Sequence, residues 1–333
     1  MTVKPRRISK RWIQKTLEFF REFLEETDFP DPERLGSRGP KFLYPEWMIM
    51  FIAVLSVKLK IKTYVQIHKM VMDYWDGIAQ DTGLEPISEC QLQDRLKKSA
   101  ITLESQQRSF FKYFLNWSND RVISADKMMN RAKGPIWHKK QKDLGIVPDR
   151  LRGLDKEATW CTSHADGWIY GHGSFSLTSH RHPALGAFMW MPNSGNEAKR
   201  MWHETACLKS CVDYVSMDSK ADSYPLYREF KRQRRMTLVT SSRRKENKSK
   251  NRILMHQSLQ TPELKQIYKE RSYRVEPMQG LVKDIFELDN CWMRGNASNR
   301  WLFAAMGLTI QMHQLNAFKQ KRSTWKIKTE VLG

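Results

Sequence analysis

The sequence predicts an α/β protein in which a mixed β-sheet flanked by helices follows an all-helical N-terminal region. Through residue 118 the apolar residues recur at helical spacing, as in RWIQKTLEFFREFLEE at 11–26. From residue 121 the pattern changes to short β-branched runs bordered by Gly, Ser or Pro. After three early strands, helices and strands alternate, and this order indicates a mixed sheet with helices on its faces.

In the N-terminal region, Pro, Gly and capping residues separate the predicted helices, which are 11–26, 44–60, 63–80, 87–100 and 101–117. The helix at 87–100 begins with Ser88 as a candidate N-cap and is rich in Gln, Arg and Lys. It is either the DNA-reading helix of a helix-turn-helix or a basic helix of no special role.

The later elements follow in alternation. Strands are predicted at 121–126, 159–164, 168–180, 185–192, 212–218 and 236–241. Helices are predicted at 196–211, 221–235 and 261–272, at a further segment beginning at Pro277, and at 298–318. The sequence shows no internal repeat.

The charge balance indicates a polyanionic partner. Lys and Arg number 57 against 36 acidic residues, a formal net charge of +21. A surplus of this size usually serves nucleic acid, with general solubility as the alternative. No apolar run approaches the length of a membrane span. The five cysteines are widely scattered, which favours a reducing intracellular setting.

Two acidic residues are predicted at the carboxyl ends of strands. Asp126 ends RVISAD, and Asp218 ends VDYVSMD. Ligands of open α/β sheets bind in the crevice at these strand ends. Aspartate is also common where strands give way to turns, so each residue alone has a purely structural interpretation.

A third acid, Glu276, stands directly before Pro277. Proline favours the first turn of a helix, so Glu276 is expected at a helix start. Lys283 follows seven residues later, on roughly the same helix face, and the pair could equally belong to a solvated face. Together with Asp126 and Asp218, Glu276 could share divalent cations, because clustered carboxylates repel one another and are hard oxygen ligands for Mg²⁺ or Mn²⁺.

The order Asp126, Asp218 and Glu276, with Lys283 behind the glutamate, resembles the DDE transposases of bacterial insertion sequences. Many of these enzymes carry a Tyr-Arg-Glu-Lys signature, and here its places are filled by Tyr268, Arg271, Glu276 and Lys283. The Tyr–Arg and Glu–Lys intervals match, whereas the Arg–Glu interval is five rather than four, so Arg274 is a local rival. Asp222 stands where a tyrosine is common. The resemblance covers residues 121–316.

The resemblance implies an RNase H-like catalytic domain in which Asp126, Asp218 and Glu276 hold two Mg²⁺ or Mn²⁺ ions. Such enzymes cut DNA at the transposon ends and join the freed 3′-hydroxyl to target DNA. Lys283 and Arg271 would meet DNA phosphates. The partners implied are double-stranded DNA, namely terminal repeats and target, and a second copy of the chain, with no membrane. The expected location is the bacterial cytoplasm, near the nucleoid. Asp120, Asp213, Glu270 and Glu287 are weaker rivals for the catalytic acids.

Within this scheme, residues 1–118 form a helical region expected to bind DNA ends. Residues 119–316 form the catalytic domain, and 317–333 a basic C-terminal tail. Residues 228–252 carry eleven Lys or Arg against two Glu, and this stretch would track a DNA backbone beside the active site. The residues proposed to contact DNA are Lys283, Arg271, Tyr268, Arg234, Arg235, Arg243, Arg244 and Lys245. Two alternatives remain: a DNA-binding relative without catalysis, and a metal-dependent nuclease without strand transfer.

Overall fold

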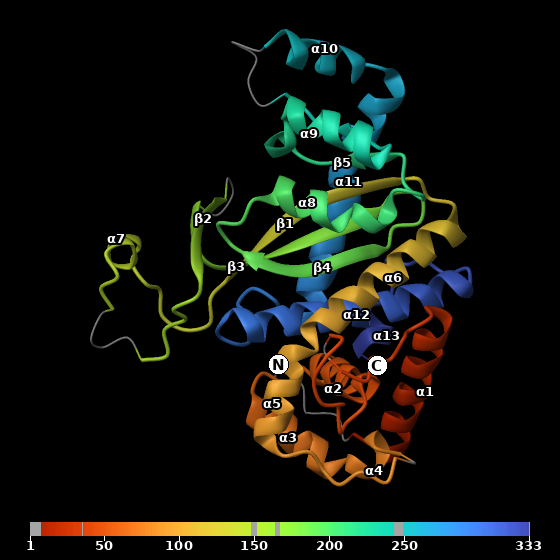
Figure 1. Ribbon diagram of the computed structural model, residues 1–333, viewed down its shortest axis with the longest axis vertical. Coiled ribbons are helices and arrows are strands. Elements are labelled where there is room, and N and C mark those ends of the chain that lie inside the picture. Colours follow the sequence, from red (N-terminus) through yellow and green to blue (C-terminus); the bar gives the residue numbers. More distant parts are fainter. Residues whose placement is uncertain are drawn as a thin grey trace.

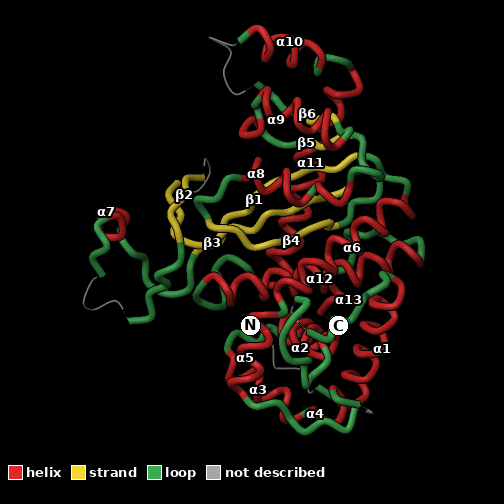
Figure 2. The backbone as a smooth tube through the Cα atoms, viewed as in Figure 1, coloured by secondary structure: helices red, strands yellow, loops and turns green. Residues whose placement is uncertain are grey.

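A computed structural model describes residues 8–34, 36–80, 82–147, 152–163, 167–242 and 249–332. In Figure 1 a twisted sheet occupies the middle of the molecule, with a group of N-terminal helices on one side of it. Figure 2 shows the strands gathered in the centre and helices surrounding them. The predicted mixed α/β architecture is therefore present.

The N-terminal region is helical, as its periodicity predicts. Its helices are α1 (Lys10–Glu26), α2 (Glu46–Lys58), α3 (Tyr64–Asp73), α4 (Trp75–Ile78), α5 (Glu89–Lys98) and α6 (Ala100–Ser118). Ser9, Thr63 and Ser88 cap α1, α3 and α5 through side-chain oxygens. The predicted helix 63–80 is interrupted at Tyr74, so it forms α3 and α4 instead of one element.

The sheet combines parallel and antiparallel pairing. Its strands are β1 (Val122–Arg131), β2 (Thr159–Ser163), β3 (Gly167–Ser179), β4 (Leu185–Pro192), β5 (Tyr214–Ser216) and β6 (Thr237–Val239). β3 pairs antiparallel with β1, β2 and β4, while β1, β5 and β6 run parallel. The order across the sheet is β4-β3-β1-β5-β6, and β2 pairs with the start of β3.

The segment between β1 and β3 projects from the body of the molecule (Figure 1). It carries α7 (Lys139–Asp143) and β2, and it has a small apolar cluster of its own around Trp137 and Tyr170.

Helices cover both faces of the sheet. α8 (Glu197–Glu204) lies in front of it and α11 (Pro262–Phe286) behind it in Figure 1. Along the chain, further short helical elements follow α8 and precede α11. They are the 3₁₀ turns η1 (Ala206–Leu208) and η2 (Ser219–Ala221), α9 (Tyr224–Glu229), the π-turn η3 (Phe230–Arg234) and α10 (Lys250–Ser258).

Pro277 does not begin a helix. The predicted helix at 261–272 and the one expected to start at Pro277 form a single helix, α11, with Pro277 inside it. An internal proline removes a backbone hydrogen bond and costs about 3 kcal/mol. The helix continues because Val275, Met278 and Val282, on either side of the proline, are fully buried.

The helical region and the sheet share one apolar core. α12 (Asn296–Lys319) packs on α2, α5, α6 and β4. Gln107 of α6 joins these elements, since its Oε1 accepts from Phe188 N–H (2.7 Å) and its Nε2 donates to the Ala304 carbonyl (2.7 Å). The segment after residue 316 completes α12 and adds α13 (Lys328–Leu332), burying Ile327 and Val331.

Candidate active site

Asp126 and Asp218 occupy equivalent positions on neighbouring parallel strands. The register of β1 and β5 pairs Ser124 with Ser216. Each aspartate follows its paired serine by two residues, and the charge of Asp218 acts on Asp126. β5 ends at Ser216, and Asp218 therefore lies just beyond its carboxyl end. The pairing of β1 with β5 therefore brings the backbones of Asp126 and Asp218 to the same part of the sheet.

Asp126 is not at the end of its own strand, contrary to the prediction. β1 continues to Arg131, because Lys127 to Arg131 remain paired with β3. The position is nevertheless level with the end of β5, so Asp126 borders the opening where β1 and β5 cease to pair. Asp126 and Asp218 thus lie where one strand ends and its neighbour continues.

The environment of Asp126 disfavours its ionised form. Burial raises the pKa of Asp126 to about 6, the nearby Arg271 guanidinium opposes this rise, and the charges of Glu197 and Asp218 add to it. Arg271 Nη1 lies 3.9 Å from Asp126 Oδ2. The predicted signature arginine therefore stands beside the first aspartate, where it partly neutralises the site.

Asp218 is held by the turn that follows β5. Its Oδ1 accepts the Lys220 backbone N–H at 3.0 Å, and its carbonyl accepts the Thr240 hydroxyl at 2.8 Å. The side chain thus caps η2 and has a fixed orientation. Asp218 is partly exposed, so it is not fully shielded from solvent.

Glu276 lies in the middle of α11 rather than at a helix start. Its side chain is exposed and makes no hydrogen bond or ion pair with the residues that the structure describes. From the same helix, Gln279 Nε2 donates to Ser176 Oγ at 3.2 Å, and Ser176 is the β3 partner of Asp126. α11 therefore crosses behind the aspartate pair, and Glu276 is on its solvent side.

Glu197, at the start of α8, was not singled out from the sequence. It is buried, and its Oε1 lies 2.9 Å from Lys127 Nζ and 2.7 Å from Lys220 Nζ. Its Oε2 is buried without a hydrogen-bond partner among the described residues. Asn196, the N-cap of α8, directly after the turn that ends β4, was the available signal for this position.

The rival aspartates have structural roles. Asp120 is buried and accepts backbone N–H groups from Val122, Arg181 and His182. Asp213 forms a two-pronged ion pair with Arg121, with N–O distances of 2.9 and 2.8 Å.

The rival glutamates are also paired. Glu270 contacts His180 and Arg274, and Glu287 pairs with Lys60.

The aspartate pair suits a hard divalent cation. Mg²⁺ is commonly held by one or two carboxylates, with waters and substrate phosphate completing its shell. Burial is the main cause of the raised pKa of Asp126, the charges of Glu197 and Asp218 add less, and a bound cation would favour the ionised form. Within the described ranges, no three His, Cys, Asp or Glu side chains form a group that could hold a metal. The two aspartates fit a cation, and Glu276 does not join them in this conformation.

The residues proposed to contact DNA are spread over several elements. Arg234 stacks over the Trp202 ring at 4.2 Å, and Arg235 is exposed with a left-handed φ of 59°. Tyr268 donates its hydroxyl to Ser241 Oγ at 2.7 Å, and Lys283 is half-buried on α11. Arg243, Arg244 and Lys245 lie outside the described residues.

No protein-family model and no curated protein sequence matches the chain. Among solved structures, it is similar to the piggyBac transposase in a cryo-EM structure of its synaptic complex with hairpin DNA. The match covers 98% of this chain and 80% of that chain, at 10% sequence identity and a TM-score of 0.43. A likeness of this degree establishes neither a family nor an activity, so function has to be argued from the chain's own residues.

The described helices include none that is both long and apolar enough to cross a membrane.

Proposed function

We propose that the chain is a DDE-type DNA transposase, which cuts DNA at transposon ends and joins the freed end to target DNA. The observation that carries the proposal is the register of β1 and β5, which sets Asp126 beside Asp218. The charge of Asp218 is also among those that raise the pKa of Asp126, although burial is the largest cause. A pair of crowded carboxylates in a chain with a net charge of +21 suits metal-assisted chemistry on a polyanion.

The sheet topology supports an RNase H-like catalytic domain. β3 is antiparallel to its neighbours β1 and β4, and the first aspartate is on β1. If β2 in the projecting segment is set aside, β5 is the fourth strand, and the second aspartate follows it. In the domain implied by the resemblance to insertion-sequence transposases, the first aspartate is on the first strand and the second on the fourth, and the arrangement here agrees with that order.

In the proposed mechanism, Asp126 and Asp218 would hold Mg²⁺ or Mn²⁺, and Glu276, exposed on α11 in this conformation, would have to move to become the third ligand. When bound, two such ions would activate the attacking oxygen and stabilise the leaving oxygen of a phosphodiester. Arg271 limits the repulsion between the carboxylates and is close enough to Asp126 to meet a phosphate at the same place. Lys220, beside Asp218 and Glu197, supplies a second positive charge at the edge of the site.

The DNA partner is proposed from the distribution of charge. Arg235 and Lys283 have no carboxylate partner among the described residues, so both are available to phosphates. Tyr268, Arg234 and the segment 243–245 would extend this contact. Transposition joins two DNA ends, and a homodimer assembled on DNA would present one active site to each.

The test is a reaction with labelled duplexes that carry the sequences flanking the gene, in Mg²⁺, Mn²⁺ or EDTA. The transposase is expected to cut and join in either metal, and Asp218→Asn is expected to bind DNA without cutting. Cutting without any joined product would assign a nuclease instead. Salt-sensitive binding with no cutting by the wild type would assign a DNA-binding relative and overturn the proposal.

A further inference from the structure

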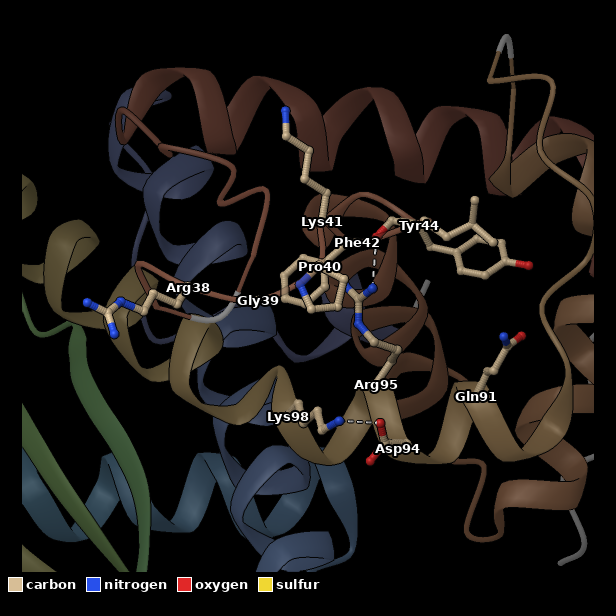
Figure 3. A pocket seen from close by; sticks show the side chains of 11 residues that line it. Arg38, Gly39, Pro40, Lys41, Phe42, Tyr44, Gln91, Asp94, Arg95 and Lys98 are labelled. Atoms are coloured by element: carbon tan, nitrogen blue, oxygen red, sulfur yellow. Dashed lines mark hydrogen bonds and ion pairs between the residues drawn. The ribbon is translucent and has the colours of Figure 1, made fainter.

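A cavity of about 540 Å³ opens between α5 and the loop that precedes α2, on the helical region and not at the aspartate pair. Figure 3 shows its two walls, with Arg95 and Lys98 on α5 opposite the loop that carries Arg38 and Phe42. The loop bends at Gly39, whose φ of 108° is disfavoured for other residues. Cavities of 300–1,000 Å³ are of the size that binds small organic ligands, so this one can enclose a group as large as about one nucleotide.

The lining of the cavity is rich in cationic side chains. Arg38, Lys41, Arg95 and Lys98 line it, with Asp94 as its acidic residue. Lys98 pairs with Asp94 at 2.6 Å, and Lys41 pairs with Glu33 at 2.7 Å.

Both of these ion pairs are exposed, so exchanging the carboxylate for a phosphate costs little. Arg38 is exposed and pairs with no carboxylate in the described part of the chain. An anion entering the cavity would therefore find cations at its rim that are free or weakly engaged.

Arg95 forms a buried, preorganised wall of the cavity. Its Nη2 lies 2.6 Å from Glu46 Oε2, its Nη1 donates to the Tyr44 carbonyl at 3.0 Å, and its guanidinium stacks on the Phe42 ring at 3.7 Å. Arg95 is 9% exposed, and its Nε has no hydrogen-bond partner among the described residues. These contacts fix the loop that precedes α2 to α5. The Nε–H of Arg95 is buried and makes no hydrogen bond to the described residues.

The lining combines this charge with flat apolar groups. Phe42 is half-buried, Pro40 is exposed and Leu43 is 65% exposed. Aromatic side chains beside cations are the usual means of holding a single-stranded nucleic acid, since the base stacks and the phosphates meet the charges. A regular duplex lies across a surface and cannot enter a hollow, whereas an unpaired base can.

We propose that this cavity binds one unpaired nucleotide of a DNA strand, with its base against Phe42 and Pro40 and its phosphates at Arg38 and Lys98. The proposal rests on the proposed function, which makes DNA the partner, and it adds the place and the strand state that the helical region recognises. Gln91, exposed on α5 and lining the same cavity, can offer its amide to the base edge.

The experiment compares two DNA duplexes that differ in a single 2-aminopurine, unpaired in one and paired in the other. Binding is followed by 2-aminopurine fluorescence and by anisotropy at fixed salt, in an Asp218→Asn background that does not cut. Preference for the unpaired duplex is expected to be about tenfold, the order of one stacked base. Phe42→Leu should remove most of this preference and leave binding of the paired duplex unchanged.

Arg38→Ala/Lys98→Ala should also abolish the preference. The matched control is Arg11→Ala/Lys15→Ala, which removes the same charge from exposed positions on α1 outside the cavity. It should weaken both duplexes alike and keep the preference. All of these positions except Phe42 are exposed, so thermal melting should show an unchanged fold in both double variants.

A preference that survives in Phe42→Leu and in Arg38→Ala/Lys98→Ala, or one that was never present, would overturn the proposal. Binding of polyglutamate, lost in the double variant without any preference for the unpaired duplex, would assign the cavity to an acidic protein segment. Cleavage by the wild type is measured separately. If cleavage is absent but the preference follows the cavity residues, the transposase proposal falls and the nucleotide site stands.

Discussion

The aspartate pair in the sheet and the cavity beside α5 differ in which charges are buried and in how they are paired. In the sheet, burial and the charges of Glu197 and Asp218 disfavour the ionised form of Asp126, and Arg271 only partly compensates. At the cavity, Lys41 and Lys98 are held by exposed ion pairs, whereas the pair of Arg95 with Glu46 is buried. A divalent cation would stabilise the carboxylates of the sheet, and the exposed cations of the cavity can exchange their carboxylate partners for phosphates. A DNA strand with its metal ions supplies both, which suggests that the sheet performs the chemistry and the helical region holds the strand.

The largest expected effect is the loss of cleavage when either aspartate of the pair is neutralised. Asp126→Asn and Asp218→Asn should each lower the cleavage rate by about 10³-fold, because metal-assisted charge stabilisation contributes several kcal/mol. Gel-shift affinity for DNA should stay within about threefold, since the phosphate contacts lie elsewhere.

Asp213→Asn is the matched control, because Asp213 is an exposed aspartate at the start of the same strand and is paired with Arg121. If Asp213→Asn abolished cleavage as fully as Asp218→Asn does, the loss of cleavage would not be specific to Asp126 and Asp218.

Two glutamates near the sheet should separate catalysis from stability. Glu197→Gln breaks a buried contact with Lys127 and Lys220, and should lower the free energy of unfolding by about 3 kcal/mol in urea titrations. Glu276→Gln, at an exposed position, should leave stability unchanged. It should lower cleavage by about 10²-fold if Glu276 joins the metal when DNA binds. Full activity in Glu276→Gln would remove this residue from the proposed site.

Lys58 is a buried lysine without a carboxylate partner among the described residues, and it tests how strongly burial alone shifts a pKa in this protein. Burial lowers the pKa of Lys58 from 10.5 to about 8, and its Nζ lies 3.0 Å from His313 Nε2. Between these two pKa values the folded state has released the proton while the unfolded chain keeps it, so this residue makes stability rise with pH.

The rise should approach about 2 kcal/mol between pH 7.5 and 10, and Lys58→Met should abolish it, as urea unfolding at the two pH values would show. An equal rise in the variant would mean that Lys58 is not desolvated as the structure indicates.

The smallest effect concerns single phosphate contacts. Arg235→Ala should weaken binding of all duplexes alike and reduce the slope of log affinity against log salt by about 1. Arg38→Ala should do the same and also weaken the preference for an unpaired base. If Arg235→Ala and Arg38→Ala behaved identically, Arg38 would contact only the DNA backbone, and the cavity would not recognise an unpaired base.

Most elements of the fold could be predicted from hydrophobic periodicity, but element ends and side-chain environments could not. The helix through Pro277 was missed because local proline chemistry favours a start there, whereas burial of Val275 and Met278 keeps the helix continuous. The length of β1 was missed because Lys127 is buried against Glu197, and no sequence pattern announces that contact.

The candidate site shows the same limit. Asp126 and Asp218 could be selected from strand ends, and the structure does set them in register. Glu197 and Arg95 gave no comparable signal, because their importance comes from contacts with residues far away in the chain. The cavity lies beside a loop whose Gly and Pro residues predicted only a turn.

The proposed transposase function requires that Asp126 and Asp218 together bind a catalytic divalent cation. The most direct measurement is an electron paramagnetic resonance titration of Mn²⁺ with the DNA-bound protein, comparing the wild type with Asp126→Asn, Asp218→Asn and Asp213→Asn. We expect bound Mn²⁺ in the wild type and in Asp213→Asn. Binding of Mn²⁺ should be at least tenfold weaker in Asp126→Asn and in Asp218→Asn. Equal Mn²⁺ binding by all four proteins would contradict this expectation.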